Sequence, residues 1–375
     1  MGTRKFLNPD SLKNVLIETA FYDFNPLFLQ NGLFTKTANW GPGIIGVVTK
    51  KHHVLKALGR KMKHDSTSPN CILSSKIKAV FLRVSILTLG IVSMSSSALS
   101  STDFETLIAP EQVQNLPENE RILIDTRPSW KYLLGHIPGA INLNDWREFT
   151  IKSGGVKGKI NQDKEFIVQK LRSLGIDHQK TIVIYGDLSD KWRTDGRFFW
   201  MFEFYGFKRV ALLKGGFQHW EKTGYPKERG FGRTPEPTAL NTSDINFNRD
   251  VLADQNWIAS RLGSQDIALI DNREKHEFDG ATPYGSSKGG HIPGALHIDW
   301  REFFKSDGTL KPHEALDTLL KSKGIQANQE IVVYCTGGVR SAMAYFVFRH
   351  LGYKVRNYDG SWWDWSSNPK LPIES

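Results

Sequence analysis

Short apolar runs alternate with longer segments of mixed polarity over the last two thirds of the chain. The runs Thr181–Tyr185 and Glu330–Tyr334 predict buried strands, and residues 162–174 and 313–323, which precede them, predict helices. Strands that alternate with helices favour a parallel sheet covered on both faces. The pattern therefore predicts an α/β fold.

The same pattern occurs twice. Five segments recur in the same order, 145 to 155 residues apart: 123–127 with 269–273, 135–140 with 290–295, 145–149 with 299–303, 182–185 with 331–334, and 215–220 with 360–365. Ordered recurrence of this kind indicates a duplicated domain of about 130 residues. We expect domains at 105–225 and 249–375, joined by a linker at 226–248 that is rich in proline and glycine.

A separate segment precedes the duplication. Residues 76–100 combine basic residues, an apolar run and a Ser/Ala tract, which is the layout of a secretory signal peptide. The apolar run contains Arg83 and is short for a membrane span, which needs about 20 residues. We expect a periplasmic or secreted protein, with an uncleaved membrane anchor or an organellar transit sequence as alternatives. Residues 1–75 form a basic extension without a recognisable motif. If the true start site lay near residue 73, the signal-like segment would begin at the N-terminus, as such segments do.

Charge and cysteine content narrow the function. The net charge is +10, but residues 1–100 hold 13 basic and 4 acidic residues, whereas the rest of the chain holds 36 and 35. The domains are therefore nearly neutral, and no nucleic-acid surface is expected on them. The only cysteines, Cys71 and Cys335, form neither a metal-ligand pattern nor a disulfide framework, so no metal or cofactor is expected.

Cys335 directly follows the second predicted strand, and a helix is predicted to begin at Arg340 or Ser341. Ligands bind at the carboxyl ends of strands in open α/β sheets. Gly337 and Gly338 allow the intervening loop to curl and point its N–H groups inward. These groups and the helix N-terminus favour a thiolate and a bound anion. The alternative is an inert core cysteine.

Two arginines are candidates for holding an anionic substrate, because a guanidinium pairs with oxyanions through its planar fork. Arg340 ends the loop, and Arg273 follows the first strand of the same copy. The alternatives are structural: an internal carboxylate partner for Arg340, and a salt bridge from Arg273 to Asp271 or Glu274.

The segment Cys335-Thr-Gly-Gly-Val-Arg340 resembles the six-residue active-site loop of the rhodanese family. The two Gly-His-Ile-Pro-Gly-Ala turns, the Asp-x-Arg strand ends and residues 358–362 resemble its tandem members, the thiosulfate and 3-mercaptopyruvate sulfurtransferases. The resemblance covers residues 105–372. It implies two doubly wound rhodanese-like domains with parallel sheets. It also implies a ping-pong reaction in which sulfur passes from a small anionic donor to a persulfide on Cys335, and from there to a thiophilic acceptor such as cyanide or a thiol. We expect the substrate to contact the rest of the loop, namely Thr336, Gly337, Gly338, Val339 and Arg340.

The loop departs from the usual form of both named activities, and the cation of Arg340 favours thiosulfate as the donor. The first copy has Gly186 in place of the cysteine, and Asp187 and Asp190 would repel an anion. We expect this copy to be silent and to wall the site of the second copy, through Lys191, Trp192 or Arg193.

The other repeated residues occur in both copies and are therefore interpreted as structural. These are His136 and His291 in the turns, and the Asp-Trp-Arg-Glu-Phe segments, in which Trp146 and Trp300 would pack and Arg–Glu pairs would lie at the surface.

Two other functions remain open. Cysteine-dependent phosphatases place five residues between cysteine and arginine, whereas four separate Cys335 from Arg340. The shorter loop suits sulfur better than a phosphate ester. The second alternative is a non-enzymatic sulfur carrier that docks to a partner protein.

Overall fold

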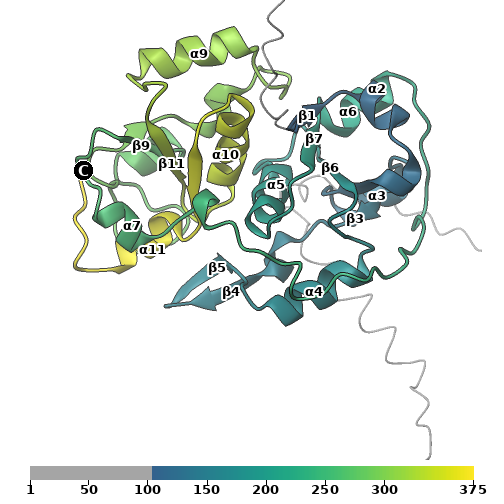
Figure 1. Ribbon diagram of the computed structural model, residues 1–375. Helices are drawn as coiled ribbons and strands as arrows, with labels where there is room; N and C mark the ends of the chain where they lie inside the picture. Colours follow the sequence, from purple (N-terminus) through teal and green to yellow (C-terminus); the bar gives the residue numbers. More distant parts are fainter. Residues whose placement is uncertain (1–103) are drawn as a thin grey trace, which may run out of the picture. The chain divides into compact units, whose positions relative to one another are not determined.

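A computed structural model describes residues 104–375 (Figure 1). The predicted basic extension, the signal-like segment and Cys71 lie outside the described residues. Within the described range, no helix combines the length and apolar character that crossing a membrane requires.

Each copy contains a five-stranded parallel sheet, and the two sheets have the same topology. In the first copy the strand order is β1-β7-β6-β2-β3, and in the second it is β8-β12-β11-β9-β10. The strands of the first sheet are β1 (Leu107–Ile108), β2 (Arg121–Asp125), β3 (Ile141–Asn142), β6 (Thr181–Tyr185) and β7 (Val210–Leu213). Those of the second are β8 (Leu252–Ala253), β9 (Ile267–Asp271), β10 (Leu296–His297), β11 (Glu330–Tyr334) and β12 (Val355–Tyr358). The predicted duplication of an α/β domain is confirmed.

Helices cover both faces of each sheet. The helices of the first copy are α2 (Pro110–Asn115), α3 (Ser129–Leu134), α4 (Lys164–Ser173), α5 (Thr194–Phe204) and α6 (Gly216–Lys222). Those of the second are α7 (Gln255–Ala259), α8 (Lys275–Phe278), α9 (His313–Ser322), α10 (Arg340–His350) and α11 (Ser361–Ser367). Short 3₁₀ helices occupy Glu118–Glu120, Trp146–Phe149, Arg249–Val251 and Trp300–Phe303.

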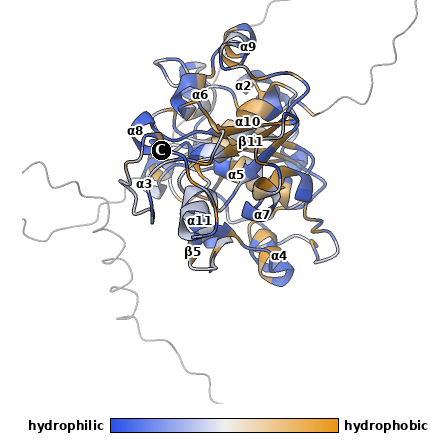
Figure 2. Cartoon of the chain, turned by 90° about the vertical axis from the view of Figure 1, so that its left-hand side faces the viewer, coloured by the Kyte–Doolittle hydropathy of each residue, from blue (hydrophilic) through white to orange (hydrophobic). Residues whose placement is uncertain are grey.

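The two faces of the central strands enter different cores, because side chains alternate along a strand. In β11, Ile331 and Val333 join one apolar cluster, whereas Val332 and Tyr334 join another on the opposite face. Figure 2 shows the apolar character of β11 and of the neighbouring α10. Burial on both faces explains why the central strands have no polar face.

The two copies share one core. Helices α5 and α10 pack against each other, and side chains of both belong to a single apolar cluster. The contact is closest at Gly196 of α5, where an added Cβ would lie 2.5 Å from the Cα of Met343. Because each of these helices begins at the carboxyl end of a central strand, the contact brings the loops before them together.

Two features differ from the expectations. An antiparallel hairpin, β4 (Thr150–Ser153) and β5 (Val156–Ile160), follows the first Trp-Arg-Glu-Phe segment, and the second copy has no counterpart among the described strands. The predicted linker, 226–248, contains no helix or strand but packs firmly, since Leu240 and Ile245 are buried. Its Glu228 forms a backbone bridge with His136 of the first copy.

Candidate functional site

Cys335 lies at the carboxyl end of β11, and α10 begins at Arg340, as the sequence predicts. The thiol is almost fully buried, and the backbone N–H of Gly338 donates a hydrogen bond to its Sγ at 3.2 Å. Gly338 has a φ of +79°, and an added Cβ would lie 2.5 Å from the carbonyl oxygen of Asp359. An added Cβ on Gly337 would collide with the ring of Trp363. Both glycines are therefore required for the loop to close over the sulfur.

The loop favours the thiolate form of Cys335. Burial raises the pKa of this thiol, but the Arg340 cation and hydrogen bonds from Ser341 and Gly337 lower it by more. The net result is a pKa below that of an ordinary cysteine. A thiolate is the nucleophilic form of the side chain, so the sulfur is prepared for covalent chemistry.

Arg340 does not face the site with a free charge. Its guanidinium donates to both carboxylate oxygens of Glu277, at 2.6 and 2.9 Å, and to the hydroxyl of Thr336 at 2.7 Å. Thr336 in turn donates to Glu277 at 2.5 Å. The structural alternative for Arg340, an internal carboxylate partner, is thus realised. Glu277 fixes the loop, and Arg340 still lies close enough to Cys335 to stabilise a thiolate.

A cavity of about 180 Å³ opens above the thiol. Its floor is formed by Cys335, Thr336, Gly337, Val339 and Arg340. Its walls are largely aromatic: Tyr284 and Trp363 come from the second copy, and Trp146, Arg147 and Trp192 come from the first. Four loop positions that the sequence predicts as substrate contacts therefore line the cavity, and Gly338 acts instead through its bond to the sulfur.

Aromatic rings hold the Arg340 side chain at the cavity floor. The guanidinium carbon lies 5.4 Å from the ring centre of Trp192 and 5.4 Å from that of Tyr284. These rings meet edge to face, with their centres 5.4 Å apart. Among the residues proposed to wall the site, Trp192 lies on the wall and the amine of Lys191 lies 4.5 Å from its ring centre. Arg193 points elsewhere, because it bonds Asp195 and the carbonyl of Gly308.

The first copy also supports the Cys335 loop from behind. Arg197, in the first turns of α5, donates to the carbonyl of Gly338 at 3.0 Å and pairs with Asp359 at 2.6 Å. All three groups are buried. Asp359 also accepts a hydrogen bond from the N–H of Ile160 in the β4–β5 hairpin. The first copy therefore fixes the geometry of the loop in the second.

Arg273 lies outside the cavity, which corrects the expectation that it holds the anionic donor. It is 1% exposed, and its guanidinium donates to both carboxylate oxygens of Asp271 and to the carbonyl of Gly290. In the copy that has no thiol, Arg127 makes the same contacts with Asp125 and the carbonyl of Gly135. An arrangement present in both copies serves the fold.

The acidic residues of the first copy's loop are also engaged in structure. Asp187 pairs with Lys131 and accepts from Gln218, and Asp190 accepts from the backbone N–H groups of Trp192 and Thr194. At Gly186 an added Cβ would lie 3.0 Å from the Thr126 hydroxyl. This loop is held closed around its own polar groups.

The repeated histidines are structural, as interpreted from their presence in both copies. His136 bonds the carbonyl of Tyr132, and His291 bonds that of Phe278. Each also forms a backbone bridge, to Glu228 and Glu374 respectively.

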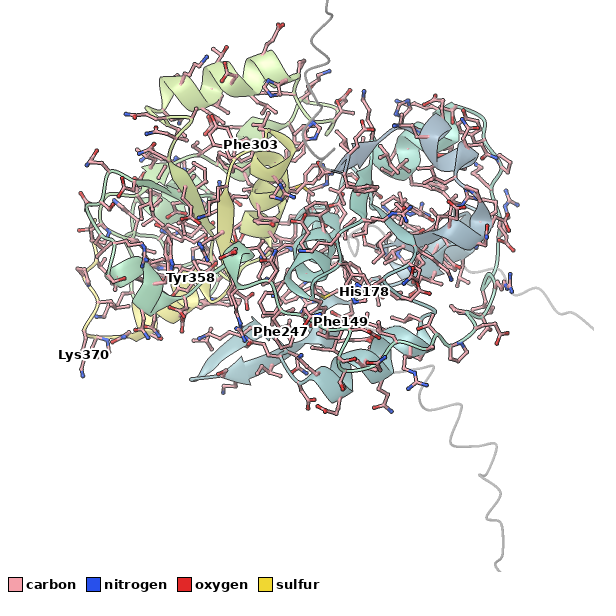
Figure 3. All side chains as sticks on the ribbon, viewed as in Figure 1. Phe149, His178, Phe247, Phe303, Tyr358 and Lys370 are labelled. Carbon is pink, nitrogen blue, oxygen red and sulfur yellow. The ribbon has the colours of Figure 1, made fainter. Side chains whose placement is uncertain are left out.

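The Asp-Trp-Arg-Glu-Phe segments differ from the expectation in one respect. Their arginines pair with the aspartate two residues earlier, Arg147 with Asp145 and Arg301 with Asp299, and not with the adjacent glutamate. The aspartate caps the short 3₁₀ helix that follows, which places it beside the arginine. The terminal phenylalanines, Phe149 and Phe303, are labelled in Figure 3, and each packs edge to face on a ring of the central helix of its copy.

Several site residues escaped sequence reasoning: Glu277, Tyr284, Trp363, Trp146 and Arg147. A signal existed for two of them. Trp363 stands where the first copy has Gln218, and Glu277 stands where it has Lys131, so both positions differ between otherwise similar copies. Differences between the copies mark the site better than their similarities do.

Comparison with known proteins agrees with this geometry. The rhodanese-like domain family matches residues 109–223 and 254–368. The sulfur carrier protein TtuD of Thermus thermophilus is 34% identical over 284 residues, which cover 72% of this chain and 96% of that protein. The thiosulfate sulfurtransferase of Azotobacter vinelandii is 31% identical over 278 residues, covering 72% and 99%. The crystal structure of YnjE superimposes with a TM-score of 0.64 at 28% identity, covering 73% of this chain and 69% of that one.

The rhodanese-like family model matches both copies of the domain, and the relatives align with nearly their whole length. The chain belongs to the tandem rhodanese family of sulfurtransferases, and it is a sulfur-transferring enzyme.

Proposed function

We propose that the enzyme moves the outer sulfur of thiosulfate to a thiophilic acceptor through a persulfide on Cys335. In the first step the Cys335 thiolate attacks the outer sulfur, the sulfur–sulfur bond of thiosulfate breaks, and sulfite leaves with the electron pair. In the second step cyanide or a thiolate attacks the terminal sulfur of the persulfide, and the Cys335 thiolate leaves. Neither step needs an external oxidant or reductant.

The observation that carries this proposal is the position of the thiol. Cys335 forms the floor of a cavity of about 180 Å³, its pKa is lowered by Arg340 and by loop hydrogen bonds, and the N–H of Gly338 points at its sulfur. The same N–H can stabilise the negative charge on sulfur when the persulfide is discharged. Burial keeps bulk water away from the reactive sulfur.

Thiosulfate remains the proposed donor, although the reason changes. The charge of Arg340 is balanced by Glu277, so it does not by itself select an oxyanion. Arg147 lines the cavity with a side chain that is 69% exposed, and its partner Asp145 is also exposed. Because exposed ion pairs are weak, Arg147 can turn to an arriving anion more easily than the buried Arg340 can. Several relatives are named thiosulfate sulfurtransferase, including the protein of Corynebacterium glutamicum at 31% identity. The buried Arg340–Glu277 pair also leaves no open fork for a phosphate ester.

The test combines mass spectrometry with steady-state kinetics on three forms of the full chain: wild type, Cys335→Ser and Cys71→Ser. After exposure to thiosulfate, we expect wild type and Cys71→Ser to gain the mass of one sulfur atom at Cys335, and to form thiocyanate when cyanide is added. Cys335→Ser should do neither. Sulfur transfer by Cys335→Ser at the wild-type rate would refute the mechanism.

A protein acceptor is the second candidate, because a relative with 34% identity is named a sulfur carrier protein. The persulfide on Cys335 would then pass its sulfur to a cysteine of a partner and not to a small molecule. Rapid loading by thiosulfate, followed by slow discharge to both cyanide and small thiols, would favour this acceptor.

We also propose that residues 76–100 direct export, as their signal-like layout predicts. Mass spectrometry of the protein isolated from its natural host would test this: cleavage near Ser100 is expected, and retention of residues 76–100 would contradict it.

A further inference from the structure

A second cavity, of about 470 Å³, lies between the two copies and shares no lining residue with the cavity above Cys335. Its lining includes the side chains of Lys214 and His219 from the first copy, and of Lys305, Lys311, His313 and His350 from the second. No aspartate or glutamate is among its lining residues in the part of the chain that the structure describes. A concave site lined by charges of one sign concentrates the field inside it.

The positive charge of this cavity is not cancelled by ion pairs. Arg193, which also lines it, is paired with Asp195 at 2.9 Å. By contrast, no direct ion pair joins Lys214, Lys305 or Lys311 to a carboxylate of residues 104–375. Asp307, two residues from Lys305, interacts with that lysine electrostatically but is not among the lining residues. The three lysines therefore border a space whose described lining contributes no carboxylate.

The pKa of His350, which lines the same cavity, is lowered. Burial lowers the pKa of His350, and the neighbouring His313 and Lys214 lower it further, whereas Glu105 opposes them. Burial is the largest cause, and the contributions of His313 and Lys214 have the sign that a positive potential in the cavity would give.

The backbone adds to the same potential. Helix α9 begins at His313, and both His313 and the preceding Pro312 line the cavity. Pro312 offers no side-chain cap to the first turn of this helix of 10 residues. The positive end of the helix dipole is thus turned toward the space that the lysines surround.

We propose that this cavity binds a small, multiply charged anion that carries phosphate or several carboxylate groups. Its volume lies within the range of about 300–1,000 Å³ that is usual for small-molecule sites. Three lysines without direct ion pairs match a multiply charged anion better than a singly charged one. Apolar residues, among them Leu212, Phe304 and Phe346, complete the lining of the cavity.

The test is isothermal titration of the full chain with pyrophosphate and, separately, with citrate at low ionic strength. The double variant Lys305→Gln/Lys311→Gln removes two cavity cations. The matched control Lys227→Gln/Lys321→Gln removes two cations that lie outside the cavity and pair with Glu221 and Asp317. Both variants change the net charge equally, so they separate a defined site from general attraction to a basic chain.

We expect the cavity variant to bind the probe at least about tenfold more weakly than wild type, and the control to bind it like wild type. Binding of pyrophosphate alone would identify a phosphate site, and binding of citrate alone a polycarboxylate site. The variant Lys305→Arg/Lys311→Arg, which keeps the charge, should retain most of the affinity. Equal affinity in wild type and the cavity variant, or binding of neither probe to the wild type, would overturn the proposal.

Discussion

The pairing of Glu277 with Arg340 makes a sharp prediction about stability. Both side chains are at most 3% exposed and share two hydrogen bonds. Removing one partner of a buried pair costs about 3–5 kcal/mol, because the other charge is left uncompensated. In Glu277→Gln the amide oxygen still accepts one bond, so we expect about 3 kcal/mol. For a cooperative unit of this size, 1 kcal/mol shifts the melting temperature by about 2–4 °C, which gives roughly 6–12 °C.

The loss should depend on pH in a defined direction. Burial raises the pKa of Glu277, but its bonds from Arg340 and Thr336 lower it by more, so the folded protein holds the carboxylate more acidic than the unfolded chain does. The pair therefore contributes fully above the ordinary pKa of glutamate, about 4.3, and its contribution fades as the pH falls below that value. The difference between wild type and Glu277→Gln should be largest near neutral pH and shrink toward acid.

Differential scanning calorimetry at several pH values measures this difference. Glu274→Gln is the matched control. The side chain of Glu274 is 24% exposed and lies 3.9 Å from the Arg340 guanidinium, but it does not form the two-bond pair that Glu277 forms. It should lower the melting temperature by no more than a few degrees. A Glu277→Gln protein that melts with the wild type at neutral pH, or a control that loses as much, would refute the assignment of Glu277 as the loop's anchor.

Three further predictions concern the loops. Arg340→Gln should raise the pKa of the Cys335 thiol, because the largest interaction that lowers this pKa is lost. The pH profile of alkylation by iodoacetamide should therefore move to higher pH, and an unchanged profile would contradict this. Gly337→Ala should reduce the rate of sulfur transfer at least about tenfold, since the new Cβ collides with Trp363 and one of the two must shift. Wild-type kinetics would show that the loop accommodates the added methyl group without loss of geometry. In a Cys335→Ser background, Gly186→Cys should take up no sulfur from thiosulfate, because Thr126 and Asp195 close the loop around residue 186. Detection of a persulfide at residue 186 by mass spectrometry would disprove this prediction.

The duplication and the position of Cys335 between a strand and a helix could be predicted because they depend on local signals. Strand β11 reads as an apolar run, Gly337 and Gly338 follow it, and α10 begins at the predicted residue. Repetition supplied what local patterns lack, since the second occurrence of a segment shows that the first is not accidental. It also identified His136 and His291 as structural, and the same comparison with Arg127 would have placed Arg273 in the fold.

The walls of the cavity could not be predicted, because they depend on how the copies pack. No local sequence pattern around Trp146 or Arg147 indicates that these residues line the cavity above Cys335. They do so because Gly196 lets α5 approach Met343 of α10, a contact between residues far apart in the chain. The β4–β5 hairpin was missed although Gly154 and Gly155 lie at its turn, since their neighbours do not form a clear apolar alternation.

The two copies differ where the loop after the central strand is anchored, and the difference is an exchange of charge. In the first copy, α3 supplies Lys131 to pair with Asp187 of the loop. In the second copy the equivalent position of α8 is Glu277, which receives bonds from Thr336 and Arg340. The cation of Arg340 thereby lies close enough to Cys335 to lower the pKa of its thiol. The carboxylate of Glu277 therefore serves the thiol indirectly, because it holds the cation of Arg340 where a thiolate at Cys335 needs it.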